Sequence, residues 1–177
     1  FLTTDLGKGK RIQYAENQSE TTAVAVDAFL DYQLVEEDLY NLNNMGATWY
    51  FDKYDAMTSM SYSFNFPNII ESEKCNIKVD VAARNTSSQS SFEVRLNGNF
   101  INSIKVNKVS DNYANIGSTG NVKFYSDSDN ISVNLNFVKN SSSAAGWLDY
   151  ISINAWRELI FTGYVMSFRN PECFDES

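Results

Sequence analysis

Most of the chain consists of short segments in which apolar and polar residues alternate, separated by clusters of Ser, Asn, Asp and Gly. A period of two is typical of strands that bury one face and expose the other. In the segment 75–83, for example, Ile77, Val79 and Val81 share one face, and polar residues lie between them. We predict strands at 23–34, 60–66, 75–83, 91–96, 99–106, 131–139, 147–155 and 158–168.

Asn97 and Gly98 separate two of the predicted strands, 91–96 and 99–106. Both residue types accept a positive φ, which a two-residue type I′ turn requires at both central positions. The sequence therefore predicts a β-hairpin at this point.

The segment 36–46 has the features of a short helix. Leu39, Leu42 and Met45 recur at spacings of three, acidic residues precede them, and a glycine follows where a helix C-terminus needs one. At least eight strands with one short helix indicate an all-β fold, and we predict an antiparallel β-sandwich that is jelly-roll-like. No repeat or linker divides the sequence, so residues 1–177 are expected to form a single domain.

Charge and composition narrow the classes of function. Asp and Glu number 22 against 14 Lys and Arg, and the basic residues are scattered, which argues against nucleic-acid binding. No apolar run approaches the ~18 residues of a membrane span. The chain has no His, so it lacks Ser-His-Asp and Cys-His catalysis, and we predict that it is not an enzyme by itself. The sequence does not decide whether Cys75 and Cys173 form a disulfide, because it does not show the distance between them.

Asp127, Asp129 and Asn130 offer oxygen ligands close together, as a Ca²⁺-binding loop does. A complete ligand set with a bidentate Glu is missing, and the same residue types are typical of turns. We interpret this segment as a polar turn with a weak candidate Ca²⁺ site, and we predict no other metal or cofactor.

Trp49, Tyr50 and Tyr54 are the candidates for a ligand-facing surface. Aromatic rings on a sandwich can stack on sugars, but they can equally fill its core and edges. If they stack on sugars, the chain is a stand-alone carbohydrate-binding or adhesion domain, which is the alternative function that the sequence leaves open.

Two sets of charged residues have a structural and a catalytic interpretation. Glu36, Glu37 and Asp38 could act as paired acids, but acidic residues before a helix more simply complement its dipole. Asp149 and Arg157 could form a catalytic acid and an anion clamp, but within an apolar segment we interpret them as a structural polar pair.

The closing segment 146–170 resembles a known family. Its sequence, "GWLDYISINAWREL" followed by "TGYVMSFRN", is similar to the end of the non-catalytic β domain of the PorU-type sortases. These are gingipain-related (C25) cysteine peptidases of the type IX secretion system in Bacteroidetes. The matching residues are Gly146, Leu148, Asp149, Tyr150, Ile151, Asn154, Arg157, Leu159, Met166, Phe168 and Arg169, and Trp147 and Trp156 replace other residues.

Two earlier stretches agree with the same family. Residues 1–12, "FLTTDLGKGKRI", resemble a family segment that enters this region. The family pattern F-x-x-Y-x-x-x-E-x-D-x-x-N-L is matched by Phe29, Tyr32, Glu36 or Glu37, Asp38, Asn41 and Leu42. The family continues Gly-Arg-x-Trp-Phe/Tyr-Gly-Glu, where this chain keeps Gly46, Trp49 and Tyr50 but has Ala47, Phe51 and Asp52. An Arg–Glu pair of the family is therefore missing here.

The resemblance implies an accessory β-sandwich that positions or covers a peptidase domain later in the same polypeptide, where the catalytic Cys and His lie. The parent would cleave C-terminal sorting signals of secreted proteins, with other secretion-system proteins as further partners. It would be exported to the periplasm or the outer-membrane cell surface. The chain begins with Phe and shows no signal peptide, so we expect it to be a piece of a longer protein. The structural motif is then Trp147, Asp149, Tyr150, Asn154, Arg157 and Arg169, which fill the sandwich and fasten its last strands.

Overall fold

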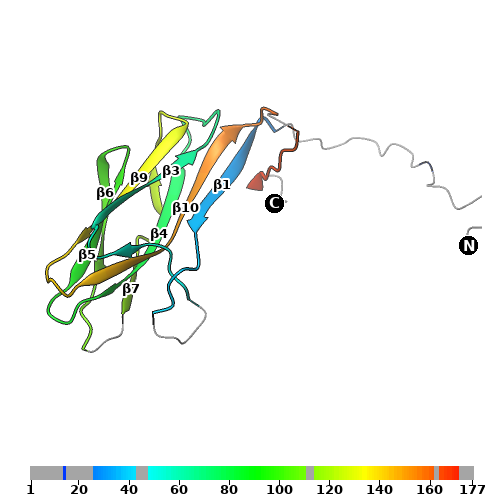
Figure 1. Cartoon of the computed structure of the whole chain (residues 1–177). Helices are drawn as coiled ribbons and strands as arrows, with labels where there is room; N and C mark the ends of the chain where they lie inside the picture. Colours follow the sequence, from blue (N-terminus) through cyan, green and yellow to red (C-terminus); the bar gives the residue numbers. More distant parts are fainter. Residues whose placement is uncertain (1–13, 15–25, 43–47, 111–113, 162–163, 172–177) are drawn as a thin grey trace, which may run out of the picture.

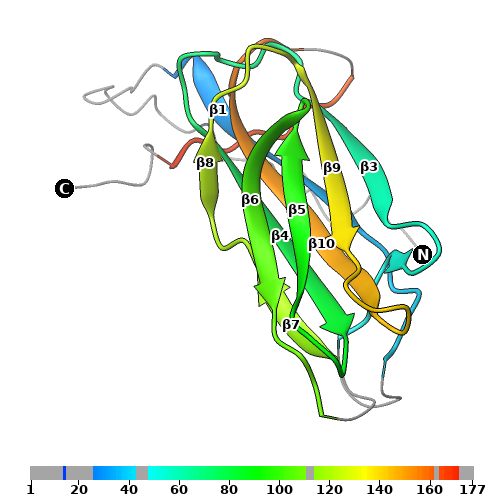
Figure 2. The same cartoon turned by 90° about the vertical axis from the view of Figure 1, so that its left-hand side faces the viewer.

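The computed structural model describes residues 14, 26–42, 48–110, 114–161 and 164–171, which contain two antiparallel sheets (Figures 1 and 2). The six-stranded sheet consists of β1 (Ala28–Glu36), β2 (Lys53–Tyr54), β4 (Cys75–Arg84), β7 (Asn115–Ser118), β8 (Val122–Phe124) and β10 (Ala145–Glu158). The four-stranded sheet consists of β3 (Ser59–Asn65), β5 (Ser90–Leu96), β6 (Asn99–Val106) and β9 (Asn130–Val138).

The strand order identifies the sandwich as a jelly roll. One sheet has the order β1-β10-β4-β7, with β2 paired to β10 and β8 paired to β4, and the other has the order β3-β9-β5-β6. In each sheet a late strand lies between two early ones, which is the interleaving that two Greek keys produce. The predicted antiparallel β-sandwich is thus confirmed.

The predicted hairpin joins β5 to β6. Asn97 has a φ of 46° and Gly98 has a φ of 84°, as the two central residues of a type I′ turn require. The Asn97 side chain also accepts a hydrogen bond from Ser132 N at 2.8 Å, which ties the turn to the neighbouring strand β9.

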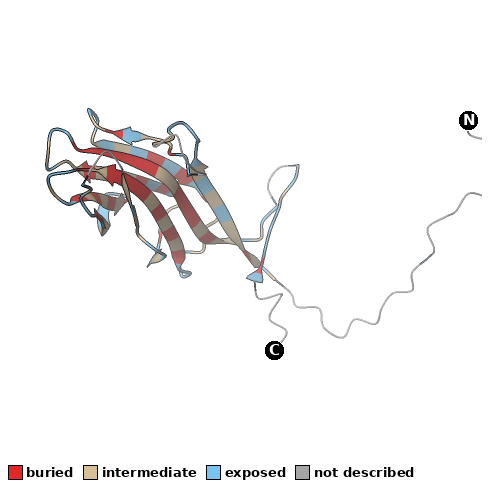
Figure 3. Cartoon of the chain, turned by 90° about the horizontal axis from the view of Figure 1, so that it is seen from below, coloured by how far each residue is buried: buried red, intermediate tan, exposed pale blue. Residues whose placement is uncertain are grey.

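The core lies between the two sheets, where the inward-facing residues of the strands are buried (Figure 3). It is filled by Ile77, Val79 and Val81 of β4 together with Phe92 and Phe137 of the opposite sheet. The alternation in the sequence therefore marks the buried face correctly, because successive side chains of a strand point to opposite faces.

The sheets approach closely at Gly146. A Cβ atom at this position would lie 2.5 Å from Cζ of Phe92, so only glycine fits without moving the ring. The Phe92 ring also packs edge-on against Tyr54 at a centroid distance of 5.3 Å. Gly146 thus allows an aromatic cluster to fill this end of the core.

One sequence prediction is wrong over its described residues, and two predicted strands have different bounds. Residues 36–42 of the helix expected at 36–46 are not helical: β1 continues through Glu36, and Tyr40 pairs with Tyr50 in an isolated β-bridge, while 43–46 lie outside the described residues. The strand expected at 158–168 ends with β10 at Glu158, and the one expected at 23–34 begins only at Ala28, with 23–25 outside the described residues.

In the described part of the chain, no helix has the length and apolar character needed to cross a membrane.

Candidate functional site

The outer face of β1 and β10 carries the candidate site. Phe29 and Val35 of β1 pack into the core, so the alternate residues Tyr32, Leu34 and Glu36 project from the outer face. Tyr32 is 54% exposed and Leu34 is 43% exposed, which is unusual for large side chains at consecutive outward positions.

A groove of about 460 Å³ lies on this face. It is lined by Tyr32, Leu34, Glu36, Asp38, Thr48, Trp49, Asp149, Tyr150 and Ser152. Three of these side chains are carboxylates and none is basic, so the groove presents negative charge beside exposed aromatic rings.

A β-bulge places Asp149 in the groove. The pairing of β10 with β4 shifts between Leu148 and Tyr150, so Asp149 is an extra residue with no partner in the register. Burial, followed by the negative charges of Asp80, Glu36 and Asp38, raises the pKa of Asp149 to about 6. The acidic residues of the groove are thus close enough to repel one another.

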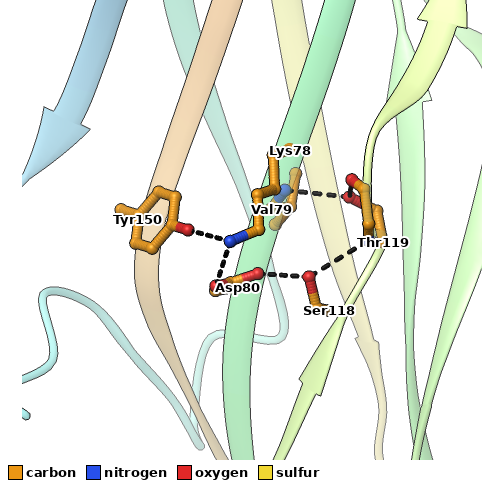
Figure 4. A network of polar contacts seen from close by, with 7 residues as sticks. Lys78, Val79, Asp80, Ser118, Thr119 and Tyr150 are labelled. Carbon is orange, nitrogen blue, oxygen red and sulfur yellow. Dashed lines mark hydrogen bonds and ion pairs between the residues drawn. The ribbon is translucent and has the colours of Figure 1, made fainter.

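Tyr150 is fixed at the edge of this groove by a polar network across β10, β4 and β7 (Figure 4). Lys78 Nζ donates a hydrogen bond to Tyr150 OH and lies 3.0 Å from Asp80 Oδ2, while Ser118 Oγ donates to Asp80 Oδ1. The bond to Tyr150, and then the one to Asp80, raise the pKa of Lys78 above its usual value. The positive charge of Lys78 also offsets part of the rise in the pKa of Asp149.

A second hollow of about 580 Å³ continues along β1 from Tyr32, which lines both. The C-terminal segment forms its wall through Ser167, Phe168 and Arg169. This segment is tied to β1 by a hydrogen bond from Leu30 N to Arg169 O at 2.8 Å and one from Asn170 Nδ2 to Ala28 O at 3.1 Å.

The residues of the predicted structural motif occupy different places. Trp147 is buried against Tyr50 in a small apolar cluster, Asn154 and Arg169 line the second hollow, and Asp149 and Tyr150 line the groove. The sequence does not indicate this division, because the bulge that separates the inward from the outward residues has no signature of its own.

The expected pair of Asp149 with Arg157 does not form, because Arg157 has another partner. Arg157 Nη1 instead lies 2.6 Å from Asp31 Oδ2 on β1, and Arg157 Nε donates to Pro67 O at 2.6 Å. Eight residues separate Asp149 from Arg157 along one extended strand, so their side chains cannot meet. Arg157 instead links β10 to β1 and to the connection after β3.

The three candidate ligand-facing aromatics separate by burial. Trp49 is 41% exposed and lines the groove, whereas Tyr50 is 6% exposed and Tyr54 is fully buried. Tyr54 OH lies 2.9 Å from the OH of Tyr62, inside the sandwich. The expectation that Tyr50 and Tyr54 face a ligand is therefore wrong, since Tyr54 lies in the core and Tyr50 is buried in the small cluster with Trp147.

The residues of the weak Ca²⁺ candidate mainly hold the β8–β9 turn. Asp129 Oδ1 accepts a hydrogen bond from Ile69 N at 3.0 Å, and Asn130 Oδ1 accepts one from Asn65 Nδ2 at 2.8 Å. Asp127 lines a separate small hollow. Among the described residues, no three His, Cys, Asp or Glu side chains form a group that could hold a metal ion.

Cys75 is a free thiol in the core, and burial raises its pKa to about 11. Cys173, its conceivable disulfide partner in the sequence, lies outside the described residues. A buried thiol with a raised pKa is a poor nucleophile, because the thiolate is the reactive form.

Sequence reasoning missed Tyr32, Glu36 and Asp38 as groove residues. The acids were assigned to a helix N-terminus that does not exist, although Glu36 continues the alternation of Leu30, Tyr32 and Leu34. Extending that alternation by one further step, two residues beyond Leu34, places Glu36 on the same outward face.

Comparison with known proteins gives structural likeness only. No protein-family model and no curated protein matches the chain. Among solved structures, dimeric latent PorU from Porphyromonas gingivalis superposes with a TM-score of 0.69 at 18% identity, over 89% of this chain and 15% of the PorU chain. This shows a shared fold, and the present chain spans only that small part of the PorU length.

Two carbohydrate-binding modules of family 35 are more distant. One from an environmental isolate has a TM-score of 0.45 at 12% identity, over 76% of this chain and 98% of its own. One from Cellvibrio japonicus Abf62 has a TM-score of 0.43 at 10% identity, over 81% of this chain and 98% of its own.

Proposed function

We propose that this chain is the non-catalytic β-sandwich accessory domain of a PorU-like, gingipain-related cysteine endopeptidase. The parent protein would process C-terminal signals of secreted proteins at the cell surface. The observation that carries the proposal is that a sequence resemblance and a structural similarity point to the same family. The residues that resemble the family from Gly146 to Arg157 lie in strand β10, and a fold like that of the PorU structure extends over 89% of the chain.

The chemistry of the chain supports a scaffolding role. It has no His to act as a general base, and the Cys75 thiol is buried with a raised pKa. Reactivity would therefore come from a peptidase domain in the same polypeptide, which is the principal partner in this proposal. Export to the periplasm or the outer-membrane surface, and contacts with other secretion-system proteins, follow from the same assignment.

Domain deletion in the parent protein tests this proposal. The full parent and a version without residues 1–177 would be assayed on a peptide that carries a C-terminal sorting signal, with the isolated chain as a third sample. We expect cleavage by the parent, reduced cleavage or misfolding without the domain, and no cleavage by the isolated chain. Cleavage by the isolated chain would contradict the proposal.

A second candidate function is a carbohydrate-binding or adhesion domain. The observation that favours it is the pair of exposed rings, Tyr32 and Trp49, beside carboxylates in one groove, because rings stack on sugars while carboxylates bind their hydroxyl groups. Binding on a glycan array that is lost in both Tyr32→Ala and Trp49→Ala would favour this function. An array without binding would leave the accessory domain as the better account.

A further inference from the structure

The edge strand β1 leaves part of its backbone unpaired. Among the residues that the structure describes, β1 pairs with β10 alone, and Leu30 N donates away from β10 to Arg169 O. Backbone groups of an antiparallel strand alternate in direction, so those of Tyr32, Leu34 and Glu36 also point to the open edge. Asp31 Oδ1 accepts from Tyr32 N at 2.8 Å, and within the described part of the chain Leu34 N has no such partner.

From Tyr32 to Glu36 this edge has few of the features that normally prevent strands from pairing. Natural edges are protected by charged side chains, especially Lys, by Pro, by bulges, by inward-pointing charges or by a cover. β1, "AFLDYQLVE", has no Lys, Pro or register shift, and its inward-facing Asp31 is paired with Arg157. The edge strand β6 of the other sheet contains Lys105 and a bulge opposite Val94 and Arg95. The edge strand β3 exposes small serines instead of large apolar side chains.

The chain itself shows that the edge of β1 accepts an extended segment. Residues around Arg169 and Asn170 lie along the first half of the strand and bond to Leu30 and Ala28. This segment runs beside β1 in Figure 1, and its hydrogen bonds within the described residues reach β1 at Ala28 and Leu30. The second half, from Tyr32 to Glu36, is left for another strand.

We infer that the edge from Tyr32 to Glu36 is a strand-addition site for an extended segment of another polypeptide that carries Lys or Arg at alternate positions. Backbone hydrogen bonds to Leu34 would supply affinity, as in β-augmentation. The alternate side chains of the added strand would lie over the groove. This inference goes beyond the proposed function and does not rest on it.

The charges of the groove select basic side chains. Glu36, Asp38 and Asp149 line it, and the rings of Tyr32 and Trp49 attract cations by their π faces. Placing a Lys or Arg among the three carboxylates relieves their mutual repulsion, whereas an acidic strand would increase it. A second copy of this chain would bring Glu36 against the same acids, so self-pairing is disfavoured.

Three synthetic peptides test the site on the full chain. The first is a heptapeptide with Lys at alternate positions and Val or Thr between them. The second has Glu in place of Lys, and the third is the Lys peptide with every internal amide N-methylated, which keeps the charge but removes the backbone donors. We expect the Lys peptide to bind, and the other two to bind at least tenfold more weakly by isothermal titration.

Two variants and one control locate the binding. Leu34→Pro removes an outward N–H that β10 does not use, and the double change Glu36→Gln with Asp149→Asn removes two groove charges without touching the backbone. Each should weaken binding of the Lys peptide about tenfold, whereas Glu73→Gln, an exposed acid in the turn before β4, should leave it unchanged. The Leu34 amide should also exchange hydrogen more slowly when the Lys peptide is bound.

Several results would overturn the inference. They are no binding of the Lys peptide, equal binding of the N-methylated peptide, or an unchanged affinity in the double charge variant. Protection of the Leu34 amide by self-association of the chain, or by an oligosaccharide instead of the Lys peptide, would also overturn it. The double charge variant keeps the test valid if Leu34→Pro fails to fold.

Discussion

Arg157 and Asp31 form the polar link between the longest strand of the domain and its edge strand. Arg157 Nη1 lies 2.6 Å from Asp31 Oδ2, and the guanidinium group is 5.1 Å from the centre of the Phe29 ring. The side chains of Arg157 and Asp31 are only 12% and 22% exposed, so water screens the pair weakly. Arg157 is one of the residues that match the closing segment of the sortase family, and its bonds to Asp31 and Pro67 give it a structural role.

Replacing Arg157 should destabilise the fold strongly. Arg157→Met removes two charge-assisted hydrogen bonds and leaves Asp31 without its partner, which costs about 2–4 kcal/mol in the free energy of unfolding. Urea denaturation measures this change. Lys53→Met is the control: its ion pair with Asp55 is 40% and 45% exposed, so the loss should stay below about 1 kcal/mol. Equal losses for the two variants would contradict the anchoring role of Arg157.

Adding a methyl group at Gly146 should strain the core. Its Cβ would lie 2.5 Å from Phe92 Cζ, and overpacking of this kind costs about 1–3 kcal/mol. Thermal unfolding of Gly146→Ala measures the cost. In a double-mutant cycle, Phe92→Leu should recover part of it by removing the clashing ring, and strictly additive effects would argue against the contact.

The stability of the domain should depend on the protonation of Asp149. Its pKa is about 6 in the folded chain and near 3.8 when unfolded, so the folded state binds the proton more tightly. The Asp149 contribution is most favourable below about pH 4 and is lost as the pH rises through about 6.

Asp149→Asn should therefore stabilise the chain at pH 7.5 and have little effect at pH 4. We expect a gain of about 1 kcal/mol at the higher pH, since solvent screens part of the repulsion. The difference between the wild-type and variant denaturation curves across this range measures it. A gain that is constant with pH would show that the charge of Asp149 has no part in it.

The Tyr54–Tyr62–Asp52 chain of hydrogen bonds should stabilise the end of the sandwich near β2. Tyr62 OH donates to Asp52 Oδ2 at 2.7 Å and lies 2.9 Å from Tyr54 OH, and burial raises the pKa of both tyrosines well above the usual value. Tyr62→Phe removes the central hydroxyl and should cost about 1–3 kcal/mol in chemical denaturation. Tyr125→Phe, at an exposed ring, should cost nothing measurable.

Alternation in the sequence predicts the strands and the buried face, because a strand in a sandwich must bury every second residue. Asn97 and Gly98 likewise predict their turn, since few residue pairs accept two positive φ values. The helix predicted at 36–46 is not present over 36–42. The prediction relied on the spacing of three between Leu39 and Leu42, although the alternation typical of a strand continues to Glu36. Leu42 packs against the cluster around Tyr50 and Trp147 instead.

The candidate groove was only partly predictable. Asp149, Tyr150 and Trp49 were singled out from their sequence context, but Tyr32 and Glu36 come to them through the pairing of β1 with β10, which joins residues more than a hundred positions apart. The bulge at Asp149 depends on the register of β4 and β10, and no single segment specifies that register.

We propose that this domain is a scaffold without catalytic groups and that the reactive groups belong to another part of the same polypeptide. The most direct measurement is the nucleotide sequence of the gene beyond the codon for Ser177. The account predicts that it encodes a peptidase domain of the gingipain-related type with a Cys and a His in catalytic positions. A reading frame that continues without such a domain, or ends there, would contradict it.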